Sequence, residues 1–263
     1  MPAPTTTRRI DYLRAPDVQA HLARDYPAAI LPFGPTEAHG THLPLGTDYL
    51  ISLATAELAA RKAEALVLPP FGYSWPGATA KLPGTMRLSA DLVQRVLVSI
   101  LGAAVAQGFR RLATVCAHGP DVHVATLVAR QAFEEFGVPV AVHHAMPGRG
   151  TTERERELAG PLLDQEGEDV GRGETSRLIV ALEILGLRPD LVDLEAPPAS
   201  GTLQPAALLE PLRSGGAGFW YSELSQHIPT PRERRLDEAR AYLDACATAI
   251  AESLDAMKEL QSR

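Results

Sequence analysis

The sequence predicts an α/β fold, a single-domain α/β/α sandwich with a mostly parallel central sheet. Short apolar runs of strand length alternate along the chain with longer segments that carry apolar residues at helical spacing. Such alternation is typical of right-handed strand–helix–strand crossovers, which place helices on both faces of a sheet. The 263 residues show no internal repeat and no long linker, so we expect residues 1–263 to form one domain.

The individual elements follow from the apolar runs and from the segments between them. Buried strands are expected at Ala28–Phe33, Ala65–Pro70, Arg111–Cys116 and Val138–His143. Helices are expected at Tyr49–Ala63, Ala90–Gln107 and Val122–Phe136. Ser89, with Asp91 two residues later, is a suitable N-cap for the second of these helices.

The C-terminal segment predicts one long helix. Apolar residues recur seven apart in the series Leu236, Leu243, Ile250 and Met257. This heptad series of apolar residues fits either a coiled-coil partner site or a single amphipathic helix that packs on the sheet. We favour the packed helix, because amphipathic helices of this kind are common in α/β domains.

Composition and charge narrow the class of protein. The formal net charge of −7 argues against a nucleic-acid surface, and no apolar run reaches the roughly 20 residues of a membrane span. Cys116 and Cys246 are the only cysteines, which indicates a reducing compartment, and residues 1–9 lack an apolar signal segment. We therefore expect a cytoplasmic protein without nucleic-acid or membrane partners.

The segment from residue 37 to 48 holds the densest set of potential metal ligands. Glu37, His39, His42 and Asp48 offer oxygen and nitrogen atoms of the type that holds zinc or manganese. They follow the apolar run Ala28–Phe33 and so lie just past the end of a strand. Open α/β sheets place their active sites at that edge.

A second strand end carries His118, which follows Arg111–Cys116. In a parallel sheet this strand end faces the same crevice as Glu37, His39 and Asp48. A single histidine after a strand is more often structural. Two ligand-bearing strand ends at one crevice nevertheless favour a metal site.

Glu174 precedes the apolar helical segment 177–185. Negative charge is favourable near a helix N-terminus whether or not it binds a ligand. From spacing alone, the better interpretation is a first-turn carboxylate beside the capping residues Thr175 and Ser176.

Three aromatic residues are candidate pocket walls: Trp75, Trp220 and Tyr221. The glycine-rich stretch from Gly215 to Gly218 provides a flexible approach to the last two. The three residues fit equally well as ordinary core aromatics.

The chain resembles the creatininase family of metal hydrolases. The family's first motif, P-x-G-S-x-E-x-H-G-x-H-L-P-x-x-T-D, is matched by Pro32, Gly34, Glu37, His39, Gly40, His42, Leu43, Pro44, Thr47 and Asp48, with Pro35 where serine is usual. A later phenylalanine-Pro-Gly-Thr element is similar to residues 82–85. The N-G-H motif falls on residues 116–118 and keeps only His118. The H-A-G-x-x-E-T-S motif falls on residues 169–176 and keeps Gly171, Glu174, Thr175 and Ser176.

The resemblance implies a site for two zinc or manganese ions. Glu37, Asp48 and His118 would hold one ion. His39 would hold the other together with Asp48, which would bridge the two.

One ligand of the second ion departs from the family pattern. The glutamate that completes this site in creatininase falls on Pro120, whose side chain cannot ligate. Glu174 is the first candidate to replace it and Asp121 the second; without either, the second ion would be weak or absent. His42 would either orient a ligand from outside the metal shell or hold the loop.

The candidate catalytic residues are Asp169 and Glu174. The family's catalytic histidine, the expected proton donor, falls on Asp169. A carboxylate can act as an acid if burial raises its pKa, but beside two cations it acts better as a base.

The implied function is hydrolysis of a C–N bond in a small cyclic amide or formamide through a metal-activated hydroxide. An alternative is a hydrolase of another small ring, including cleavage of a C–C bond. A catalytically inactive scaffold is a third possibility, against which the retention of five potential ligands argues. Family members typically form hexamers, so the resemblance also implies a homo-oligomer.

Overall fold

The structure, a computed structural model, describes residues 7–146, 153–154, 157, 170–196, 220–224 and 234–261. Within these residues the sheet has four strands in the order β2-β1-β3-β4, and every neighbouring pair is parallel. The strands are β1 (Ala28–Phe33), β2 (Leu66–Val67), β3 (Arg111–Cys116) and β4 (Val140–His144). The predicted α/β fold with a parallel sheet is confirmed.

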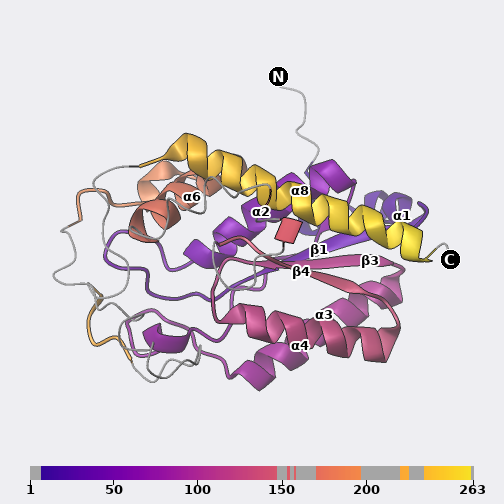
Figure 1. The fold of residues 1–263 in the computed structure, drawn as a ribbon, viewed down its shortest axis with the longest axis horizontal. Helices are drawn as coiled ribbons and strands as arrows, with labels where there is room; N and C mark the ends of the chain where they lie inside the picture. The colour runs from indigo at the N-terminus through magenta and orange to yellow at the C-terminus, as the bar shows by residue number, and fades with distance from the viewer. Residues whose placement is uncertain are drawn as a thin grey trace.

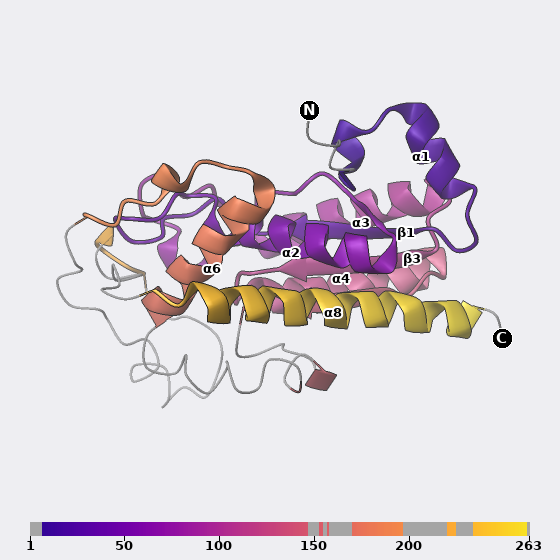
Figure 2. The ribbon, with the colours of Figure 1, turned by 90° about the horizontal axis from the view of Figure 1, so that it is seen from above.

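Helices cover both faces of this sheet (Figures 1 and 2). One face carries α2 (Thr47–Ala63), α6 (Val170–Leu185) and α8 (Leu236–Gln261). The other face carries α3 (Ala90–Gln107) and α4 (Asp121–Phe136). The shorter elements are η1 (Ile10–Tyr12), α1 (Ala15–Leu22), η2 (Gly77–Thr79) and η3 (Pro189–Leu191). Each face has its own buried apolar cluster, so the sheet forms the middle of a three-layer sandwich.

The strands end in register at one edge. Phe33 of β1 lies opposite Cys116 of β3, and Cys116 lies opposite His144 of β4. The chain segments that follow these strand ends therefore start side by side. This is the edge at which the sequence places its candidate ligands.

Prolines explain where the predicted strands were too long. The second strand was expected to run to Pro70 but ends at Val67, ahead of Pro69 and Pro70, which have no N–H group for the ladder. Likewise β4 begins after Pro139 rather than at Val138. By contrast, β1 and β3 have the predicted bounds.

The predicted packing of the C-terminal helix is confirmed. The helix α8 packs against α2 and α6 and also contacts β3 and β4. In Figure 2 it runs alongside α2 and α6. Leu243, Ile250 and Met257 of the heptad series are buried, whereas Leu236 is largely exposed.

The helix α3 begins at the predicted residue, with Ser89 at the N-cap position. The hydroxyl of Ser89 does not bond a backbone amide, however, and donates to the Asp91 carboxylate instead. By length and apolar composition alone, α3 is the one helix of the described part that could cross a membrane. Its apolar face, including Val93, Leu97 and Leu101, is buried in the core beneath the sheet.

Candidate metal centre

The segment between β1 and α2 carries most of the candidate ligands. It folds back on itself through a hydrogen bond from the Glu37 amide to the Leu45 carbonyl oxygen, 2.9 Å long. A side chain at Gly34 would meet Cβ of Asp48 at 3.0 Å, so the glycine allows the first turn of α2 to approach the end of β1. This close approach brings Asp48, in that first turn, beside Glu37.

Five buried side chains converge at this edge of the sheet. Nδ1 of His118 lies 3.2 Å from Oε1 of Glu37 and 3.3 Å from Oδ2 of Asp48. Nε2 of His39 lies 3.3 Å from Oδ1 of Asp48 and 3.4 Å from Oε1 of Glu174. Asp48 thus faces one histidine with each of its two carboxylate oxygens. We call these five residues the ligand cluster.

Backbone carbonyl groups orient both histidines of the ligand cluster. Nδ1 of His39 lies 3.0 Å from the carbonyl oxygen of Glu37, and Nε2 of His118 lies 3.2 Å from that of Trp75. These nitrogens act as donors because a carbonyl oxygen can only accept. The opposite ring nitrogen of each histidine faces the carboxylates, which is the arrangement seen in metal-bound histidines.

A short segment before α3 supports the ligand cluster from outside. The hydroxyl of Thr79, in η2, donates to Oε2 of Glu37. The hydroxyl of Ser74 donates to Oδ1 of Asp121, at the start of α4. Together with the Trp75 carbonyl group, these contacts place the segment 74–79 against Glu37, His118 and α4.

Asp121 therefore lies beside the ligand cluster and is bonded to Ser74. It is fully buried, and burial raises its pKa to about 7, although His118 and Ser74 act in the opposite direction. Of the two residues proposed to replace the family glutamate, Glu174 is the one that faces a histidine of the cluster.

Glu174 reaches the ligand cluster from within a helix. Because α6 includes residues from Val170 onward, Glu174, Thr175 and Ser176 are helical, and the capping role suggested by spacing alone was wrong. Oγ1 of Thr175 lies 2.9 Å from Nε2 of His42. His42 thus connects the ligand-bearing loop to α6, next to Glu174.

Burial and neighbouring charges shift the pKa of three members of the ligand cluster. Burial alone would lower the pKa of His39, but Asp48 and Glu174 raise it well above its usual value. Burial likewise opposes the charging of His118, whose pKa Glu37 and Asp48 raise well above the usual value. The two histidines in turn hold the pKa of Asp48 far below its usual value, despite burial.

The ligand cluster fits divalent cations. It buries three carboxylates with two imidazoles, an arrangement that favours added positive charge. Oδ2 of Asp48 is buried without a well-directed hydrogen bond from any described residue. Glu37, His39 and Asp48 each place a ligand atom within 4.8 Å of the others. Carboxylate and imidazole donors suit zinc or manganese and do not decide between them.

The remaining predicted residues are placed as follows. Asp169 lies outside the described residues. Trp75 contributes its carbonyl group, and Tyr221 is buried with a pKa raised by burial and by the nearby Glu37. Trp220 is 46% exposed. Sequence reasoning missed Ser74 and Thr79, because isolated hydroxyls in a loop carry no recognisable pattern.

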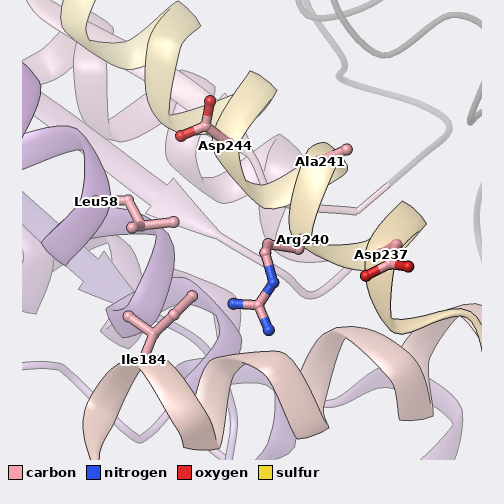
Figure 3. A pocket seen from close by; sticks show the side chains of 6 residues that line it. All are labelled: Leu58, Ile184, Asp237, Arg240, Ala241 and Asp244. Carbon is pink, nitrogen blue, oxygen red and sulfur yellow. The ribbon is translucent and has the colours of Figure 1, made fainter.

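A hollow of about 460 Å³ lies elsewhere, between α2, α6 and α8 (Figure 3). It is lined by Leu58, Ile184, Asp237, Arg240, Ala241 and Asp244. Two of its charged side chains are paired within the protein, Arg240 with Glu183 and Asp244 with Lys62. No member of the ligand cluster lines it, so this hollow is separate from the ligand cluster.

The fold and the ligand cluster define an α/β protein with a candidate metal centre at the carboxyl edge of its sheet. The family model described as creatininase, creatinine amidohydrolase, matches residues 11–254. The chain therefore belongs to the creatininase family.

Several relatives are hydrolases. The chain is 27% identical over 206 residues to the mycofactocin precursor peptide peptidase of Mycobacterium ulcerans, covering 75% of this chain and 73% of the relative. It is 25% identical over 255 residues to creatinine amidohydrolase of Pseudomonas putida, covering 90% and 92%. A 3-dehydro-scyllo-inosose hydrolase of Thermotoga maritima is 30% identical over 115 residues, covering 43% and 32%.

Solved structures show the same fold. A creatininase structure described with Mn has a TM-score of 0.69 at 22% identity, covering 96% of this chain and 98% of that chain. A mutant creatininase of the Zn-Zn type also has a TM-score of 0.69, at 21% identity, covering 97% and 98%. The predicted family resemblance is confirmed.

Proposed function

We propose that this protein is a metal-dependent amidohydrolase that hydrolyses a C–N bond in a small cyclic amide or formamide. The observation that carries the proposal is the ligand cluster, in which two histidines each face at least two carboxylates at the carboxyl edge of the sheet. Membership of a hydrolase family supports the same class of reaction.

The ligand cluster divides into two sets that share Asp48. Glu37, Asp48 and His118 would hold one ion, and His39, Asp48 and Glu174 the other. Bound zinc or manganese ions supply Lewis acidity toward a carbonyl oxygen and lower the pKa of water.

The chain's own groups prepare these two sets. The hydroxyl of Thr79 fixes one oxygen of Glu37 and leaves the other toward His118. The carbonyl oxygens of Glu37 and Trp75 hold the N–H of His39 and of His118, respectively. We retain Asp169 as the proposed group that exchanges a proton with the leaving nitrogen.

Peptide-bond hydrolysis is a second candidate function. The similarity to the mycofactocin precursor peptide peptidase covers three quarters of this chain. A peptide bond and a cyclic amide present the same carbonyl carbon and leaving nitrogen, so one ligand cluster serves both reactions. Hydrolysis of another small ring, including C–C cleavage, remains a broader alternative that the partial match to the inosose hydrolase favours.

The test is an activity screen of protein loaded with zinc or with manganese. Matched sets of cyclic amides, formamides and short peptides are incubated with wild type and with Asp48→Asn. Hydrolysis by wild type that the variant lacks would support the proposal. Absence of hydrolysis in every set, with ions demonstrably bound, would contradict it.

We also propose that the protein is a homo-oligomer and that it is cytoplasmic. Size-exclusion chromatography of the same sample tests the first proposal, and fractionation of source cells tests the second.

A further inference from the structure

Two cations gather around one exposed indole ring. Nζ of Lys81 lies 5.1 Å from the centre of the Trp220 ring, and Cζ of Arg87 lies 5.9 Å from the same centre. All three side chains are exposed. Among the described residues, neither Lys81 nor Arg87 has an ion-pair partner. We call these three residues the cationic rim.

The loop that carries both cations is fixed to the ligand-bearing loop. The Ala38 amide donates to Oγ1 of Thr85 over 3.0 Å, and the Met86 amide donates to the Thr36 carbonyl oxygen over 2.8 Å. These two contacts lie between Lys81 and Arg87 in the chain and hold residues on either side of Glu37. The cationic rim is therefore attached directly to the loop that supplies Glu37 and His39 of the ligand cluster.

The segment that carries the indole ring is attached on the other side. The Tyr221 amide donates to the Ala78 carbonyl oxygen over 3.0 Å, and the Tyr221 side chain packs with Ala38 and Leu82. Tyr221 is close enough for Glu37 to act on its hydroxyl group electrostatically. Trp220 directly precedes Tyr221 in the chain and is exposed. Its ring therefore lies at the surface, next to a residue that neighbours the ligand cluster.

The two positive charges of the cationic rim favour the binding of an anion. Both cations lie within about 6 Å of the centre of one exposed indole ring, and an exposed cation–π contact compensates little of their charge. The chain as a whole carries a net charge of −7, yet no described carboxylate neutralises this pair. A planar carboxylate fits a guanidinium group with two parallel hydrogen bonds and can accept a third from an ammonium group.

We propose that Lys81, Arg87 and Trp220 form a subsite for a carboxylate of the substrate, with the indole ring as a wall for the adjoining carbon skeleton. The inference rests on the proposed function, because it places the bond that is hydrolysed at the neighbouring ligand cluster. The carboxylate belongs either to a small acid that carries the amide or to the C-terminus of a peptide. The chemistry at the rim is the same for both.

Binding is tested first, without any turnover. Trp75→Phe keeps the backbone carbonyl group that faces His118 and leaves Trp220 as the only tryptophan. In this background, zinc-loaded protein is titrated with benzoate and with benzamide while Trp220 fluorescence is followed. We expect benzoate to bind at least about tenfold more tightly, as for a charge-assisted contact. The double substitution Lys81→Gln/Arg87→Gln should remove this preference, whereas Arg95→Gln, an exposed arginine on α3, should keep it.

Carboxylates also bind metal ions, and the variants separate the two sites. A benzoate preference that persists in Lys81→Gln/Arg87→Gln would place the carboxylate on the ions and overturn the subsite. The absence of any benzoate preference in the Trp75→Phe background would overturn it as well.

Hydrolysis then distinguishes the source of the carboxylate. The matched pairs are 4-formamidobenzoate with formanilide, and a short peptide with its C-terminal amide. A preference of about tenfold or more for the free acid in the first pair assigns a small acid, and in the second pair a peptide C-terminus. Hydrolysis with no preference in either pair overturns the subsite and leaves the proposed function intact. No hydrolysis of any probe, with the benzoate preference retained, overturns the proposed function and leaves the subsite.

Discussion

Oε1 of Glu174 lies 3.4 Å from Nε2 of His39, although the two residues belong to α6 and to the loop after β1. The family resemblance predicts that one ion lacks a glutamate ligand, because Pro120 falls at that position. The contact places the Glu174 carboxylate beside His39, a predicted ligand of the same ion. Pro120 itself stands at the N-cap position of α4.

Glu174→Gln keeps the shape of the side chain and removes its charge. We expect this variant to lose one of two ions, with an affinity for that ion lowered at least about tenfold. Competition with a chelating dye measures both affinities. Glu183→Gln, on the same helix but at the surface, is the matched control. Equal affinities for both ions in Glu174→Gln and wild type would show that Glu174 is not a ligand.

Thr79→Val tests the support of Glu37 from outside the ligand cluster. Valine has the shape of threonine without the hydroxyl that donates to Oε2 of Glu37. We expect the ion held by Glu37 and His118 to bind about 10–100-fold more weakly, because outer-shell partners orient ligands. The other ion should be affected less.

The control for Thr79→Val is Thr126→Val, which removes a hydroxyl that bonds only a helix carbonyl group on α4. Both variants are measured by the same dye competition. Identical affinities in Thr79→Val and wild type would refute the supporting role of the hydroxyl.

Removal of the ions should destabilise the fold. Without them, three buried carboxylates share two imidazoles. Each ion present at about 1,000 times its dissociation constant contributes about 4 kcal/mol to the free energy of unfolding, since only the folded chain assembles the ligand cluster. Thermal unfolding is compared before chelation, after chelation and after the ions are restored. Superimposable unfolding curves for ion-loaded and ion-free protein would speak against ions at this site.

The core beneath α8 provides a stability prediction that is independent of the ligand cluster. Ile250 is fully buried among residues of α2, α6 and the sheet. We expect Ile250→Ala to lower the free energy of unfolding by about 2–5 kcal/mol through lost burial and the cavity left behind. Leu127→Ala, at a position 56% exposed, should change it by less than about 0.5 kcal/mol. Denaturant unfolding measures both, and similar losses in the two variants would argue against the packing described for α8.

The sequence predicted most of the fold because its signals are local. The apolar runs of β1 and β3 have clear boundaries, and the helical spacing of α3 predicts both of its ends. The errors at β2 and β4 fall next to prolines, where a run is apolar but its backbone cannot complete the ladder.

The site was predictable only where topology brings its residues together. Parallel strands end at one edge, so the loops after β1 and β3 meet, and with them His39 and His118. Glu174 reaches that edge from α6, which spacing alone did not show. The contact between Lys81 and Trp220 joins two segments that are far apart in the chain, and no local pattern in either segment predicts it.

The central claim is that Asp48 joins two ion sites, since each of its carboxylate oxygens faces a different histidine. The most direct test is the number of zinc or manganese ions per chain, measured by elemental analysis on wild type and on Asp48→Asn. We predict about two ions per chain in wild type and none held tightly in the variant, with circular dichroism confirming that the variant is folded. A wild-type chain that holds no ion after zinc and manganese are offered, or a folded Asp48→Asn variant that still holds two, would contradict the account.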